Sequence, residues 1–103
     1  MTLDEMIKEL MDVHNLSITQ FASKTGLSPT TARAMLIPGR YPNMGTLFKV
    51  CKAFEIPPAF FFDRDMTADV FRLLAVYFTS SPEQQEHIRK TIKSLANERK
   101  PKS

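Results

Sequence analysis

Basic and hydroxyl side chains are concentrated in a part of the chain that has no acidic residue. Residues 17–54 lack aspartate and glutamate, whereas residues 1–16 carry four acids. The basic residues of the acid-free stretch are Lys24, Arg33, Arg40, Lys49 and Lys52. Such groups act by charge pairing and hydrogen bonding, so the stretch suits a polyanionic partner. Charge alone favours a simple solvated face equally well.

The residues that covalent or metal chemistry requires are not grouped. There is no pair of carboxylates, no nucleophile with its base, and no glycine-rich phosphate loop. His14 and His87 have no cysteine or histidine at metal-binding spacing. Cys51 falls on an apolar helical stripe with Leu47 and Phe54, which predicts a buried, unreactive thiol. We therefore expect no enzyme activity, no metal and no cofactor.

Length and composition predict a compact cytoplasmic protein. A chain of 103 residues with 43% hydrophobic residues can form a core without disulfides. Its single cysteine fits a reducing compartment. No signal peptide opens the chain, and no uncharged run is long enough for a membrane span, so no membrane association is expected.

Two short helices joined by one glycine must position the basic and hydroxyl groups. Ser17 and Gln20 form a capping-box pattern, which predicts a helix start, and Gly26 ends that helix. Ser28 then caps a second short helix, expected over residues 29–36, with a proline in its first turn.

The other elements are also helical. Apolar residues recur at helical spacing and no segment shows sustained two-residue alternation, so the expected fold class is all-α. Besides the two short helices, the patterns predict helices over about 3–14, 44–54, 67–78 and 82–96, and a short helical turn within 58–62.

The segments "LSITQFASKTGLSPTTARAML" and "GRYPNMGTLFKVCKAFEIPPAFFFD" resemble the phage repressor and Cro family, also called the xenobiotic-response-element type. The resemblance covers roughly residues 3–63. The matching residues are Ala22, Gly26, Leu27, Ser28, Pro42, Thr46, Leu47, Ala53, Ile56, Phe61, Phe62 and Asp63. It implies a five-helix helix-turn-helix domain whose third helix, residues 29–36, lies in the major groove of double-stranded DNA.

The resemblance also implies which residues contact DNA. The base-facing positions are Pro29, Thr30, Arg33 and Ala34. The DNA-backbone positions are Ser17, Thr19, Thr31, Arg40, Tyr41 and Asn43. Pro29 and Ala34 depart from the family pattern, because neither makes the paired hydrogen bonds that glutamine, asparagine or arginine makes to base edges. Ile18 departs too, standing where family members often carry a glutamine that touches the backbone.

The last forty residues predict a further helical unit. We divide the chain into a DNA-binding domain at 1–65, a helical pair at 66–98 and a basic tail at 99–103. Each helix of the pair has one apolar stripe, so the pair either folds back on the domain or meets the same helices of a second chain. For the second case, the expected homodimer residues are Phe71, Leu74, Phe78, Ile88, Ile92 and Leu95.

Together these observations favour a cytoplasmic, sequence-specific DNA-binding transcriptional regulator, acting as a dimeric repressor. Two alternatives share the fold. One is the antitoxin of a toxin–antitoxin pair, which needs a small protein partner. The other is a protein-docking module that has lost DNA binding, which the plain base-facing positions favour.

Overall fold

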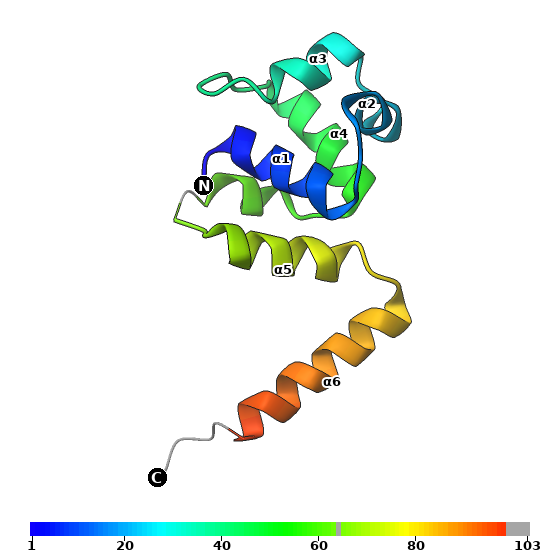
Figure 1. Ribbon diagram of the computed structural model, residues 1–103, viewed down its shortest axis with the longest axis vertical. Helices are drawn as coiled ribbons and strands as arrows, with labels where there is room; N and C mark the ends of the chain where they lie inside the picture. Colours follow the sequence, from blue (N-terminus) through cyan, green and yellow to red (C-terminus); the bar gives the residue numbers. More distant parts are fainter. Residues whose placement is uncertain (64, 99–103) are drawn as a thin grey trace.

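The computed structural model describes residues 1–63 and 65–98, and these residues form helices joined by short loops (Figure 1). The expected basic tail at 99–103 lies outside them. In chain order the elements are α1 (Leu3–Val13), α2 (Ile18–Thr25), α3 (Pro29–Ala34), α4 (Met44–Phe54), the 3₁₀ helix η1 (Pro58–Phe62), α5 (Ala68–Phe78) and α6 (Pro82–Glu98). The described residues contain no strand, so the all-α prediction is confirmed.

Side-chain caps define where most of these helices begin. In α2, α3, α4 and α5 a side-chain oxygen of the preceding residue accepts a backbone N–H of the first turn. The capping residues are Ser17, Ser28, Asn43 and Thr67. A cap of this kind satisfies an amide that would otherwise lack a partner, so short helices start at defined residues.

The core lies between α1, α2 and α4. Phe21 and Phe54 are fully buried and their ring centroids lie 6.0 Å apart. Leu10 of α1 and Val50 of α4 are also fully buried. Figure 1 shows α3 at one end of this packed unit, with the α3–α4 loop beside it. The fold therefore holds α3 at the surface rather than enclosing it.

The third helix is shorter than the sequence indicates. It ends at Ala34, and Met35 is its C-cap, whereas the expected helix runs to residue 36. Beyond Ala34 the backbone hydrogen bonds span three residues instead of four, as in a 3₁₀ helix. The N–H of Leu36 donates to Arg33 O, and the N–H of Ile37 donates to Ala34 O. Pro38 follows, and a proline disfavours helical geometry in the residue before it.

The two C-terminal helices have different environments. Helix α5 packs along α1, and Phe71 is buried with its ring centroid 5.8 Å from that of Phe61. Arg72 forms an ion pair with Glu9 of α1. The core therefore extends past residue 65. Phe71 belongs to this core, so it is not part of the surface that we expected a second chain to cover.

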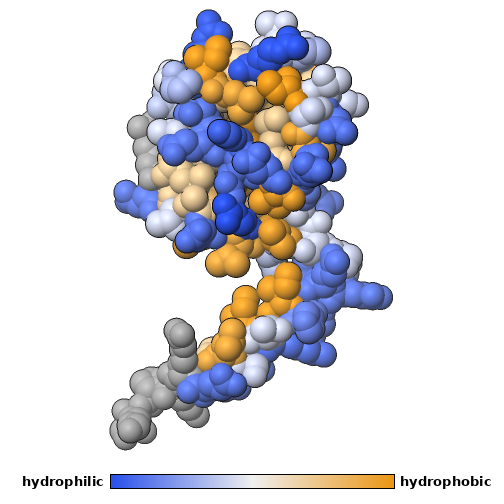
Figure 2. All heavy atoms as spheres, viewed as in Figure 1, coloured by the Kyte–Doolittle hydropathy of each residue, from blue (hydrophilic) through white to orange (hydrophobic). Residues whose placement is uncertain are grey.

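Helix α6 has no such support. It points away from the rest of the molecule (Figure 1), and none of its residues is buried. Its apolar residues lie on the side that faces α5 (Figure 2). Among the described helices, none combines the length and apolar character that crossing a membrane requires.

Candidate nucleic-acid interface

Helix α2 braces α3 through a tight turn. Ser17 Oγ accepts the N–H of Gln20 at 3.2 Å, and Gln20 Oε1 accepts the N–H of Ser17 at 2.9 Å. Gly26 ends α2 with φ of +75°, a conformation that disfavours a residue with a side chain. The chain can therefore turn within three residues and start α3 at Pro29.

A buried hydroxyl occurs inside α2, where an apolar side chain is usual. Thr25 is buried, and its Oγ1 donates to Phe21 O at 2.8 Å, one turn earlier in the same helix. Because the hydroxyl finds its partner locally, burying it leaves no unsatisfied donor.

Helix α3 is held by one side only. Ala32 and Met35 are buried, which fixes the helix against the core. Ser28 Oγ accepts the N–H of Thr31 at 3.2 Å and donates to Thr31 Oγ1 at 2.9 Å. With Pro29 in the first turn, these contacts give a helix of six residues, about 9 Å long.

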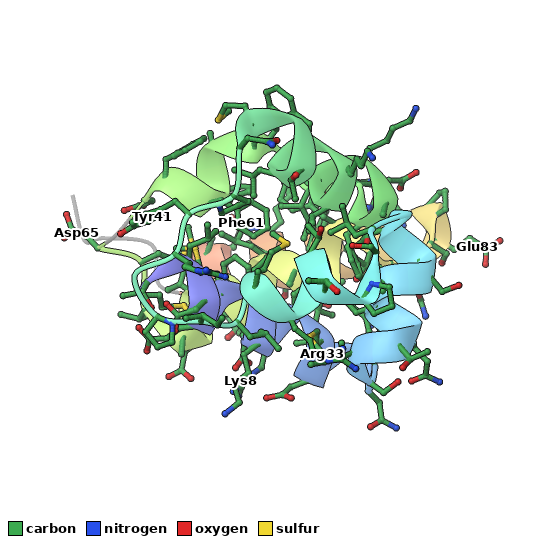
Figure 3. All side chains as sticks on the ribbon, turned by 90° about the horizontal axis from the view of Figure 1, so that it is seen from above. Lys8, Arg33, Tyr41, Phe61, Asp65 and Glu83 are labelled. Atoms are coloured by element: carbon green, nitrogen blue, oxygen red, sulfur yellow. The ribbon has the colours of Figure 1, made fainter. Side chains whose placement is uncertain are left out.

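The other side of α3 is accessible. Pro29, Thr30 and Arg33 are exposed and Ala34 is half-buried, so the expected base-facing residues can all be reached from outside. Figure 3 looks down on this end of the molecule, with α3 and the loop that carries Tyr41 toward the viewer and the buried Phe61 labelled for comparison. No acidic side chain occurs on α3 or on the loop that follows it.

A groove beside α3 gathers several expected DNA-backbone residues. Its volume is about 340 Å³, and its lining includes Thr31, Ala34, Arg40, Tyr41 and Asn43. These residues come from α3, from the loop and from the cap of α4, so the fold brings together groups up to twelve positions apart. The groove therefore offers hydroxyl, guanidinium and amide groups directly next to the exposed side of α3.

The loop that forms one wall of the groove has its own local structure. Gly39 has φ of +79°, and the N–H of Arg40 donates to Ile37 O at 3.2 Å. Tyr41 is 64% exposed, and Asn43 Oδ1 accepts the N–H of Thr46 at 2.8 Å. The side-chain oxygen of Asn43 thus serves first as the cap of α4, leaving its amide group at the groove.

Ser17 and Thr19 lie apart from this groove. Both are exposed at the start of α2 and neither is among the residues lining the groove. Three residues that line it were not predicted as site residues, namely Met35, Pro42 and Thr46. The spacing of Thr46, three positions after the cap Asn43, is the signal that predicts its place beside the loop.

The basic side chains of the acid-free stretch differ in the contacts they make. Within the described residues, Arg33 and Arg40 form no ion pair. Lys24 differs, because its Nζ lies 5.2 Å from the centre of the Phe54 ring. Arg33 and Arg40 can therefore bind an anion without first breaking an internal bridge, which lowers the cost of binding.

Reactive and metal-binding groups are not assembled in the part of the chain that the structure describes. No group of three or more histidine, cysteine or acidic residues there has metal-site geometry. Cys51 is buried, as predicted, and burial raises the pKa of its thiol. A thiol with a raised pKa is mostly protonated at neutral pH and is a weak nucleophile.

Comparison with known proteins identifies the family. Residues 6–64 match the family model of the Cro/C1-type HTH DNA-binding domain, which is more than half of the chain. Neither the curated proteins nor the solved structures gave a match. The matched region contains α2, the Gly26 turn, α3 and the groove, and it agrees with the resemblance expected over roughly residues 3–63. The chain therefore belongs to the Cro/C1-type helix-turn-helix DNA-binding family.

Proposed function

We propose that this protein is a sequence-specific transcriptional regulator that inserts α3 into the major groove of double-stranded DNA and acts as a dimeric repressor in the cytoplasm. The observation that carries the proposal is the exposed side of α3, which is short and free of acids, carries Arg33 and has Arg40 nearby; neither arginine forms an ion pair within the described residues. Insertion into the groove requires a narrow element without negative charge, because each phosphate repels an acid and a bulky face cannot enter.

Base reading is assigned to four residues. Arg33 is the candidate for guanine, whose two acceptors in the major groove match the guanidinium fork. Pro29 and Ala34 are apolar and pack against thymine methyl groups, while Thr30 adds a methyl contact or one hydrogen bond. A helix only about 9 Å long reaches few base pairs. Each half-site is therefore short, and two copies are needed for useful specificity.

Positioning on the duplex is assigned to the groove and to the start of α2. Arg40 and Tyr41, with Thr31 and Asn43, face the phosphates on one side of the recognition helix. The hydroxyls of Ser17 and Thr19 contact the strand on the other side. Such contacts fix register without reading sequence. The salt dependence of binding comes from the charged contacts, because only a Lys or Arg that neutralises a phosphate releases counterions, and Arg40 is the charged member of this set.

Repression follows from occupancy, because a dimer bound across a promoter excludes other proteins. The dimer surface retains five of the expected residues, without the buried Phe71. These are Leu74, Phe78, Ile88, Ile92 and Leu95. Two linked domains raise the affinity for paired half-sites above that of one domain, since the second contact forms at high effective concentration.

The test is selection of bound sequences from random duplex DNA, followed by titration of the selected site. We expect a near-palindromic motif. Arg33→Ala should weaken binding to the selected site by about 5- to 150-fold per half-site, as loss of 1–3 kcal/mol implies, with little change on scrambled DNA. Arg40→Ala should weaken both sequences alike and reduce the salt slope by about one.

The control is Lys90→Ala, which removes one positive charge from an exposed position on α6, far from α3 (Figure 1). It should leave selected-site affinity nearly unchanged. Absence of any enriched motif, with no salt-dependent binding by the intact protein, would overturn the proposal and favour the protein-docking alternative.

A further inference from the structure

The apolar sides of α5 and α6 face each other across an open groove. Leu73 is 71% exposed, Ile92 59% and Leu95 53%, although all three point into the same space. The groove has a volume of about 690 Å³ and is lined by Leu73, Leu74, Tyr77, His87, Ile88, Arg89, Thr91, Ile92 and Leu95. Figure 2 shows the apolar band along the inner side of α6.

Two hydrogen bonds connect the end of α5 to the first half of α6. Gln85 Nε2 donates to Tyr77 O at 2.9 Å, and Arg89 donates to the Tyr77 hydroxyl at 2.6 Å. Ser81 and Gln84 form a capping box that starts α6 anew, with Pro82 at its first position. These hydrogen bonds hold α6 at a defined angle to α5, so the shape of the groove between the two helices is fixed by specific contacts.

Helix α6 needs a partner to be a stable element. It has seventeen residues, none of them buried, and most of its side chains are polar. An isolated helix of this length is marginal in water, because helices in proteins depend on the packing of an apolar side. Ile88, Ile92 and Leu95 recur at spacings of four and three, which is the seam of a helix that packs against another helix.

We propose that α6 of a second copy fills this groove, running antiparallel to the first α6, and that each copy inserts its α6 into the groove of the other. This inference specifies the geometry of the dimer in the proposed function and rests on it. The occupant must supply an apolar helical stripe of matching length, and α6 is such a helix. Reciprocal insertion around a twofold axis covers both unpartnered stripes at once, as an isologous interface requires.

The charges along α6 favour the antiparallel direction. Its first half carries Glu83 and Glu86, and the basic residues Arg89, Lys90 and Lys93 follow. A parallel pair in register places each charged residue beside its own copy, whereas an antiparallel pair with its axis near Thr91 leaves only Arg89 and Lys93 as facing like charges. The helix dipoles also oppose each other only in the antiparallel pair.

The area available suffices for a stable dimer. Helix α6 is about 25 Å long and about 10 Å wide. Laid between α5 and α6 of another copy, it contacts two helices along most of its length. Two such insertions bury on the order of 1,500 Å² in total, within the range of specific protein–protein interfaces.

The first experiment compares charge-matched variants. Ile92→Glu with Leu95→Glu changes the net charge by two units on the apolar stripe, and Ser94→Glu with Asn97→Glu changes it equally at exposed positions of α6 that do not line the groove. By light scattering the wild type and the Ser94→Glu, Asn97→Glu variant should have twice the 11.8 kDa mass of one chain, and the Ile92→Glu, Leu95→Glu variant that of a monomer. A monomeric wild type, or equal dissociation by both variants, would overturn the inference.

The second experiment measures helix direction with spin labels on single introduced cysteines, Glu83→Cys, Thr91→Cys and Glu98→Cys, in dimeric protein. Cys51 is buried and is expected to stay unlabelled. With the twofold axis near Thr91, labels there should be closest, and labels at 83 or 98 should be separated by about 20–25 Å along the helix axes. Equal short distances at all three positions would indicate a parallel pair and refute reciprocal antiparallel insertion.

These results separate the inference from the proposed function. A wild-type dimer with the antiparallel distances that selects no DNA motif would overturn the regulator function and leave the dimer geometry standing. A wild-type monomer that binds DNA and dimerises only when a small neighbour-encoded protein is added would overturn the geometry and favour the antitoxin alternative.

Discussion

Replacing Phe71 by alanine tests whether α5 is a part of the DNA-binding core. The side chain is 2% exposed, and it meets Phe61 edge to face at 5.8 Å. Burial of a phenylalanine with little room to relax makes truncation cost about 3–5 kcal/mol. Loss of the aromatic pair lies within that figure, since it contributes about 0.5–1.5 kcal/mol. A domain of this size has about 5–15 kcal/mol of total stability, so the variant should lose a large part of it.

The assay is urea unfolding followed by far-ultraviolet circular dichroism, because the chain has no tryptophan to report by fluorescence. Phe71→Ala should lower the midpoint strongly with an unchanged m-value. The control is Val70→Ala on the same helix, where the side chain is 45% exposed and the change should be within about 0.5–1 kcal/mol.

The reasoning would be refuted if Phe71→Ala cost less than about 1 kcal/mol, or if residues of α5 unfolded in a separate, earlier transition. Either outcome would mean that α5 does not pack on α1 in solution and that the core ends near residue 65. The homodimer surface would then again include Phe71.

Three further changes probe the elements that position the site. Burial, and then the charge of Lys24, lowers the pKa of His14, so the unfolded chain binds a proton at this residue more readily than the folded chain. The free energy of unfolding should therefore fall as pH drops below 6.5. His14→Gln should reduce the change of the urea midpoint between about pH 7 and pH 5. Thr25→Val removes a hydroxyl whose acceptor, Phe21 O, keeps its helical hydrogen bond, so thermal unfolding should show stability unchanged or raised by up to about 1 kcal/mol. Gly26→Ala meets no atom within 4 Å but must adopt φ of +75°, so calorimetry should show a loss of about 1–2 kcal/mol.

Local chemistry made much of this fold predictable. The caps at Ser17, Ser28 and Asn43 depend on a few neighbouring residues, so the sequence indicates the starts of α2, α3 and α4 correctly. The end of α3 was predicted two residues late, because Met35 and Leu36 continue the apolar spacing. Their backbone instead follows the tighter geometry that leads into the loop.

Other features depend on contacts between distant segments. Helices α5 and α6 each have one apolar stripe, so periodicity cannot tell which stripe joins the core. The distinction arises because α5 lies along α1, while the joint at Tyr77 directs α6 outward. The groove beside α3 also combines groups from α3, the loop and α4, and its extent follows only from the folded arrangement. The roles of its residues toward DNA stay predictions.

The sulfhydryl of Cys51 in α4 can report how often the folded protein opens locally. Cys51 is 5% exposed, so an aromatic disulfide reagent in water reaches it only when α4 separates from its neighbours. When reclosing outpaces modification, the reaction rate gives the population of the opened form. Operator fragments that bind the folded domain should slow this reaction, so its rate in purified protein measures how strongly they bind.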